Sequence, residues 1–143
     1  MEDIEFKKWC TGSNRKIEFS EIVELLGEHI SRGSKIFIGS DSFVNNRKIC
    51  FTSAICLHGS QLGSRYFFFN EYVKRSRFLT LTPRITEEVR RSIEIACILV
   101  DEFDFNSDSI ELHMDVSAPN AGAATSKLSD MLKGYVQGFG LGC

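Results

Sequence analysis

Long apolar runs, cysteine pairs and an excess of charge of one sign are all missing from this sequence of 143 residues. The longest apolar stretch, 93–100, is interrupted by Glu94 and is too short to cross a bilayer. The first ten residues, MEDIEFKKWC, lack the basic start and apolar segment of a secretory signal, so we expect a cytoplasmic protein. The net charge of −2 gives no overall case for nucleic-acid binding, although a local basic patch is compatible with it.

The motifs of several common classes of site are also absent. The five cysteines contain no CxxC pair and none of the three histidines lies close to a cysteine cluster, which predicts reduced, buried thiols and no zinc site. The glycine-rich segment GFGLG has no P-loop lysine. No GxSxG segment presents a serine nucleophile. These absences exclude most nucleotide-binding and serine-hydrolase interpretations.

The apolar patterning that is present is typical of an α/β protein. Apolar residues recur at helical spacing in FSEIVELLGEHISRG, which ends at Gly33. Three strand-like segments follow, and their short connections favour antiparallel pairing. Residues 1–18 are a polar segment that Phe6 or Trp9 would anchor. We therefore predict a single α/β domain over 1–143 with a mixed sheet, in the order helix, three strands, helix, strand, helix, at residues 19–33, 35–43, 47–59, 64–73, 85–103, 109–117 and 125–138.

Two aspartates occur late in apolar strands, where an unpaired carboxylate is expensive to bury. Asp41 follows KIFIGS and Asp115 follows SIELHM, and small or turn-forming residues come after each. If these strands are neighbours, both carboxylates meet at one end of the sheet, where a divalent cation would relieve their repulsion. Mg²⁺ prefers hard oxygen ligands of this kind. The other interpretation, in which each aspartate only caps a loop, stays open.

The long helix offers three glutamates as a further ligand. At about 100° per residue, Glu88 lies roughly 80° from the centre of the apolar stripe, whereas Glu87 and Glu94 point outward. Glu88 is the preferred ligand, with the alternative that it is only an acid favoured by the helix dipole. His113 shares the strand face of Asp115 and could assist proton transfer, or it could simply pack as a strand side chain.

The order β-β-β-α-β-α, with these acids in the first and fourth strands and the intervening helix, resembles the ribonuclease H-like fold. The segments IFIGSDSF, FTSAICLHG, GSRYFFFNEYV, EEVRRSIEIA, LHMDVSA and KGYVQGFG resemble, more narrowly, the bacterial YkuK-type family over residues 34–140. The resemblance implies Mg²⁺ or Mn²⁺ bound by Asp41, Glu88 and Asp115. In that family a fifth strand leads to another acid; we expect GFGLG to enter this strand, and Asp130 does not match that acid.

A local excess of positive charge lies between residues 74 and 91. Phosphate binding needs such an excess whatever the overall charge, although a solvated loop is the alternative. The residues predicted to contact nucleic acid are Lys74, Arg75, Arg77, Arg84 and Arg91.

Two functional hypotheses follow from these observations. The first is a metal-dependent nuclease acting on RNA, an RNA/DNA hybrid or structured DNA. Its catalytic residues would be Asp41, Glu88, Asp115 and His113. The second is a non-catalytic nucleic-acid-binding or protein-interaction module, because a fold alone does not fix a function.

Overall fold

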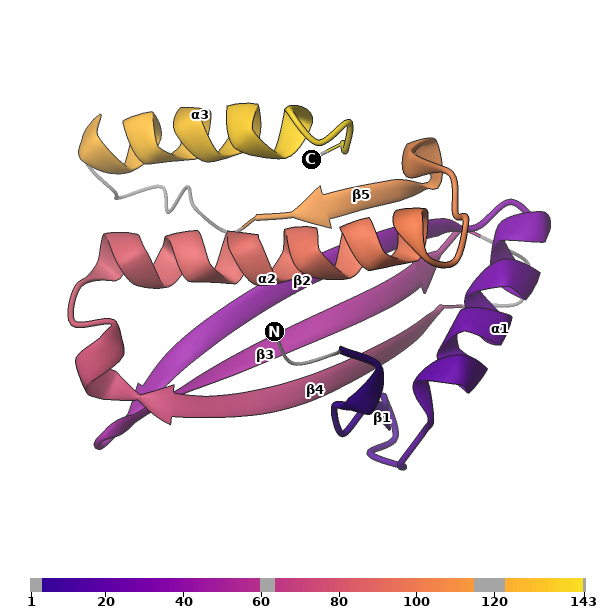
Figure 1. Ribbon diagram of the computed structural model, residues 1–143, viewed down its shortest axis with the longest axis horizontal. Helices are drawn as coiled ribbons and strands as arrows, with labels where there is room; N and C mark the ends of the chain where they lie inside the picture. Colours follow the sequence, from indigo (N-terminus) through magenta and orange to yellow (C-terminus); the bar gives the residue numbers. More distant parts are fainter. Residues whose placement is uncertain (1–3, 60–63, 115–122, 143) are drawn as a thin grey trace.

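The computed structural model describes residues 4–59, 64–114 and 123–142, which form a five-stranded mixed sheet and three α-helices (Figure 1). The predicted order of helix, three strands, helix, strand and helix is confirmed. In chain order the elements are η1 (Ile4–Phe6), β1 (Cys10–Thr11), α1 (Phe19–Ser31), β2 (Lys35–Asn45), β3 (Lys48–His58), β4 (Arg65–Lys74), η2 (Arg75–Arg77), α2 (Leu81–Asp101), η3 (Ser107–Ser109), β5 (Ile110–His113) and α3 (Ala123–Gln137).

The strand order in the sheet is β1-β4-β3-β2-β5. β2, β3 and β4 pair antiparallel, as their short connections predict, and β5 runs parallel to β2. Asn46 adopts a φ of 56° in the turn between β2 and β3, a conformation that asparagine tolerates better than most residues. Gly142 forms a parallel bridge with Glu111 of β5, so the GFGLG segment does begin to pair beside the fourth predicted strand.

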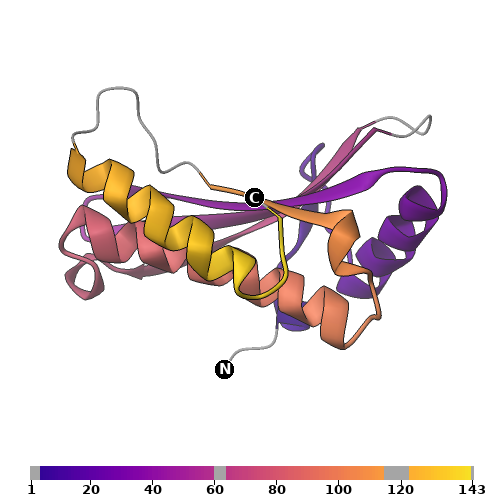
Figure 2. The same cartoon turned by 90° about the horizontal axis from the view of Figure 1, so that it is seen from above.

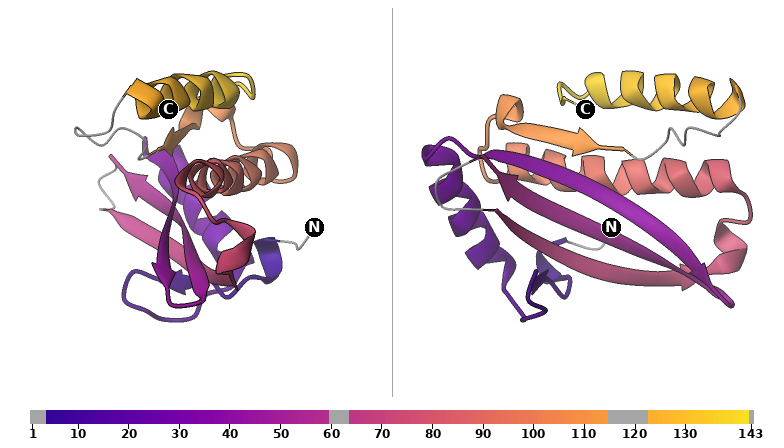
Figure 3. Two further views of the ribbon diagram at one scale, coloured as in Figure 1. Left: turned by 90° about the vertical axis from the view of Figure 1, so that its left-hand side faces the viewer. Right: turned by 180° about the vertical axis from the view of Figure 1, so that it is seen from behind.

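The sheet has two unlike faces, which alternate along each strand. The covered face packs against α1 and α2, which lie on the same side of the sheet, with α3 beside α2 (Figure 2). Ile36 and Ile38 of β2 belong to this face and are fully buried. We call the other side the open face. It carries Phe37, Gly39 and Asp41, and no helix among the described residues lies over it (Figure 3).

Two local predictions need correction, the start of α2 and the anchor of the N-terminal segment. α2 begins at Leu81, four residues earlier than expected, because Pro83 is accommodated in the first turn, where its missing N–H costs nothing. Its N-cap is Thr80, whose side chain makes no capping bond. Trp9 is a buried anchor of the N-terminal segment, whereas Phe6 is 83% exposed.

Candidate functional site

Asp41 lies in the middle of β2, and its side chain is exposed on the open face. Its neighbours in sequence, Ser40 and Ser42, bond to α2 on the covered face, and successive strand residues point to opposite faces. One carboxylate oxygen, Oδ1, accepts a hydrogen bond of 2.8 Å from the Ser42 backbone N–H. The carboxylate is thus held locally and stays accessible to solvent.

A hollow surrounds Asp41 on the open face. It exists because Gly39 and its cross-strand partner Ala54 have little or no side chain. His113 stands beside Gly39 in the parallel register of β2 and β5, and its ring lies 4.7 Å from that of Phe37 between centroids. The structure therefore brings Asp41 and His113 to the rim of one hollow.

Glu88 lies on the other side of the sheet. It is 8% exposed, on the sheet-facing side of α2, as its position relative to the apolar stripe predicts. The Ser42 hydroxyl donates a hydrogen bond to Oε2 of Glu88, while the Ser42 backbone N–H donates to Asp41. Ser42 thus connects the two predicted ligands, but the structure places their carboxylates on opposite faces of β2 and does not bring them together.

A metal site is not complete within the described residues. They contain no group of three or more histidine, cysteine, aspartate or glutamate side chains that could hold an ion. Asp115, the second predicted strand ligand, lies outside the described residues. The exposed Asp41 carboxylate is a suitable hard donor for Mg²⁺ or Mn²⁺, but one carboxylate alone does not make a site.

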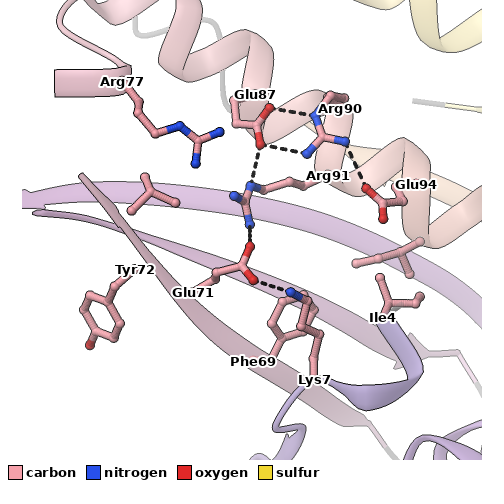
Figure 4. Close-up of a pocket in the computed structure, with 12 residues that line it drawn as sticks. Ile4, Lys7, Phe69, Glu71, Tyr72, Arg77, Glu87, Arg90, Arg91 and Glu94 are labelled. Carbon is pink, nitrogen blue, oxygen red and sulfur yellow. Dashed lines mark hydrogen bonds and ion pairs between the residues drawn. The ribbon is translucent and has the colours of Figure 1, made fainter. Parts of the chain in front are cut away.

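A chain of ion pairs connects α2 to β4 and the N-terminal segment on the covered face (Figure 4). Arg91 donates to Glu71 at 2.6 Å and to Glu87 at 2.8 Å, and its guanidinium stacks on the Phe51 ring at 4.3 Å from the centroid. Arg90 connects Glu87 to Glu94. We call this set the ion-pair cluster; its members are Lys7, Glu71, Glu87, Arg90, Arg91 and Glu94.

The ion-pair cluster corrects two expectations. Glu87 and Glu94 do not point outward into solvent, because their side chains are 13% and 15% exposed and paired with arginine. Arg91 is equally withdrawn, since its side chain is 11% exposed and already occupied by two carboxylates. Arg91 is therefore a poor candidate for phosphate binding.

Two carboxyl groups of the ion-pair cluster, those of Glu71 and Glu87, are held in the charged form. Partial burial acts to raise the pKa of Glu71, but hydrogen bonds from Lys7 and Arg91 and their charges outweigh it and lower that pKa below 4.5. Burial likewise acts to raise the pKa of Glu87, and the bonds and charges of Arg90 and Arg91 reverse the effect. The cluster thus neutralises its own positive charge.

The other predicted basic residues divide into two groups. Lys74 and Arg75 meet Arg47 and Lys48 where the β2–β3 turn lies beside the end of β4, and all four are exposed. We call these four residues the basic tip. Sequence reasoning missed Arg47 and Lys48, although the turn signal NN directly precedes them.

Arg77 and Arg84 do not belong to the basic tip. Arg77 lies over the ring of its neighbour Phe78. Arg84 is half-buried on α2, and its Nε has no hydrogen-bond partner among the described residues. Their predicted role in nucleic-acid binding stays a prediction.

Comparison with known families agrees with this architecture. Residues 18–143 match the family model described as Ribonuclease H-like. The chain belongs to the ribonuclease H-like family. Neither the curated proteins nor the solved structures include a significant match to this chain.

For this ribonuclease H-like protein, the narrower YkuK-type resemblance stays a prediction. The assignment of Asp41, Glu88 and Asp115 as metal ligands, which that resemblance implies, also stays a prediction. Among the described residues four thiols are free, and the expectation that they are buried holds for Cys50 but not for Cys10, Cys56 and Cys97, which are half-buried. No described helix has the length and apolar character needed to span a membrane.

Proposed function

We propose that this ribonuclease H-like protein is a nuclease that hydrolyses phosphodiester bonds in RNA, an RNA/DNA hybrid or structured DNA with Mg²⁺ or Mn²⁺. Asp41 and Asp115 are the proposed core of the metal site. The observation that carries this proposal is the parallel register of β2 and β5, in which Gly39 pairs with His113. Asp41 and Asp115 each follow two residues later, so the same register, extended by two residues, would put both acids on one face.

The open face offers two of the groups that such a reaction would use, the Asp41 carboxylate and the His113 imidazole. The bound metal would polarise the phosphodiester and help to form a hydroxide nucleophile. The Asp41 carboxylate is exposed and orientated by the Ser42 N–H, so an oxygen is available as a ligand. The His113 imidazole is exposed on the rim of the same hollow, where one ring nitrogen could deliver a proton to the leaving oxygen.

Thermal unfolding during a Mn²⁺ titration tests the metal site directly. An ion that binds only the folded protein stabilises it by about 2.7 kcal/mol at a concentration of one hundred times Kd. We expect a rise in melting temperature for the wild type, and loss of this rise in Asp41→Asn and Asp115→Asn. Asp101→Asn is the matched control, because Asp101 is exposed at the end of α2. No rise for the wild type at millimolar Mn²⁺ would refute the metal site.

Glu88→Gln separates two roles of Glu88. The amide keeps an oxygen that accepts from Ser42 but loses the charge that a metal needs. If Glu88 is a ligand, the Mn²⁺-dependent rise is lost; if Glu88 only anchors α2 to β2, the rise persists. Hydrolysis of labelled RNA, hybrid and junction substrates, measured in parallel, shows whether metal binding supports cleavage.

The second candidate is a non-catalytic nucleic-acid-binding module on the same fold. The placement of Asp41 and Glu88 on opposite faces of β2 favours this candidate, because two of the three acids implied by the family resemblance then cannot share one metal ion. In this case the protein binds nucleic acid but cleaves none of the three substrates with Mg²⁺ or Mn²⁺. A protein-interaction module would bind none of them.

A further inference from the structure

We propose that the open face binds single-stranded nucleic acid, with the phosphate backbone on the basic tip and a base stacked on Tyr72. This inference rests on nucleic acid being the partner in the proposed function, and it does not require hydrolysis. It assigns a site to residues that neither the metal site nor the ion-pair cluster uses.

The charges of the basic tip are concentrated and unneutralised. Lys48 pairs directly with Lys74 across the antiparallel ladder, and like charges in that arrangement are destabilising. Arg75 donates its backbone N–H to the Arg47 carbonyl at 2.9 Å, which fixes the two arginines beside the lysines. None of the four has an ion-pair partner among the described residues. An anionic ligand would remove this repulsion, and the phosphodiester backbone of a nucleic acid carries the opposite charge.

An aromatic platform adjoins these cations. Tyr72 is 57% exposed and lines a groove together with Asn45, Asn46, Arg47 and Lys48. Bases of any sequence stack on such rings, and neighbouring cations hold the backbone. Interaction with the Cys50 side chain raises the pKa of Tyr72, so the phenol is neutral beside a phosphate. The groove thus combines the two features of a single-strand site.

A second exposed ring extends the platform toward Asp41. Phe43 is 53% exposed and faces Tyr72 across Cys50, since Phe43 pairs with Cys50 and Cys50 pairs with Tyr72. The next open-face row along the strands is Asp41, Thr52 and Asn70, about 7 Å away. A strand held at the tip would therefore pass from the two rings to the Asp41 hollow.

Stacking selects single strands over duplexes. Bases within a duplex are already stacked on one another and present only their edges, whereas unpaired bases can lie flat on an aromatic ring. We therefore expect the platform to prefer an unpaired segment.

The test is fluorescence anisotropy with a labelled 12-nucleotide single strand and the matching duplex, in EDTA so that neither metal nor cleavage contributes. We expect tighter binding of the single strand, and at least a five-fold loss of affinity in Tyr72→Leu. Tyr135→Leu is the matched control, because Tyr135 is 51% exposed on α3, away from the open face. The wild type and both variants are compared by circular dichroism to confirm that each is folded.

Salt dependence measures the basic tip separately. Four phosphate contacts predict a slope of log affinity against log salt of roughly −3 for a single strand, and Lys48→Gln should reduce it by about 0.7. Lys133→Gln, at an exposed position of α3, should leave the slope unchanged.

Three outcomes overturn this inference: equal losses in Tyr72→Leu and Tyr135→Leu, preference for the duplex, or equal binding of a poly-glutamate peptide. Cleavage without Tyr72-dependent binding would remove this inference and leave the nuclease proposal standing. Tyr72-dependent binding without any metal effect would do the reverse.

Discussion

The ion-pair cluster on the covered face and the basic tip on the open face both hold arginines from the same stretch of sequence, yet their charges do different things. Arg90 and Arg91 are neutralised by Glu71, Glu87 and Glu94. Lys74 and Arg75, in contrast, lie beside the two other cations of the basic tip and pair with no carboxylate in the part of the chain that the structure describes. Charge on the covered face therefore stabilises the fold, whereas charge on the open face is available to a ligand.

The largest expected effect comes from breaking the ion-pair cluster with Arg91→Ala. The change leaves Glu71 and Glu87 partly buried without their shared partner and uncovers the Phe51 ring. Removing one partner of such a pair costs more than the pair itself contributes, so we expect a loss of about 2–3 kcal/mol in unfolding free energy. Urea titration at pH 7 measures it.

Arg77→Ala is the control for this change. Arg77 lines the same pocket as the ion-pair cluster (Figure 4) but lies over the Phe78 ring and has no ion pair among the described residues, so its loss should cost less than about 1 kcal/mol. Equal losses in the two variants would show that the ion-pair cluster contributes no more than surface charge.

A smaller effect is expected from pH. The pKa values of Glu71 and Glu87 are lower in the folded protein than the ordinary 4.5 of the unfolded chain. The unfolded state therefore binds more protons in this range, so the contribution of these groups is complete above about pH 4.5 and is lost as pH falls through their folded-state pKa values. Urea midpoints between pH 7 and pH 3 should show this decline.

The same titration sharpens the comparison when it is repeated on Arg91→Ala. Once both glutamates are protonated they no longer need the guanidinium, so the stability difference between the wild type and the variant should shrink below pH 4.5. A difference that stays constant with pH would assign the loss to the missing stacking on Phe51 and not to charge.

The sequence predicts the layers of this protein better than its contacts. Alternating apolar residues and short connections correctly indicate three antiparallel strands, and the buried Ile36 and Ile38 already determine that Ser42 faces the helices while Asp41 does not. Applying this alternation to Asp41 and Glu88 together would have separated the two carboxylates. The pairing of Arg91 with Glu71 could not be predicted, because it depends on how α2 crosses β4.

The smallest expected effect has opposite signs for stability and binding. Lys48→Glu places an acid directly across from Lys74, so it replaces a cross-strand repulsion with an attraction. We expect a gain of about 0.2–1 kcal/mol in unfolding free energy, together with weaker binding of a single-stranded oligonucleotide, because one cation is lost and one anion is added. Urea titration and anisotropy on one preparation measure both quantities.

A variant that is more stable and binds as tightly as the wild type would show that Lys48 is only a solvated charge. A variant that loses both stability and binding would show that the residue supports the turn. Only higher stability together with weaker binding would show that the repulsion between Lys48 and Lys74 lowers stability but supports the binding of an anion.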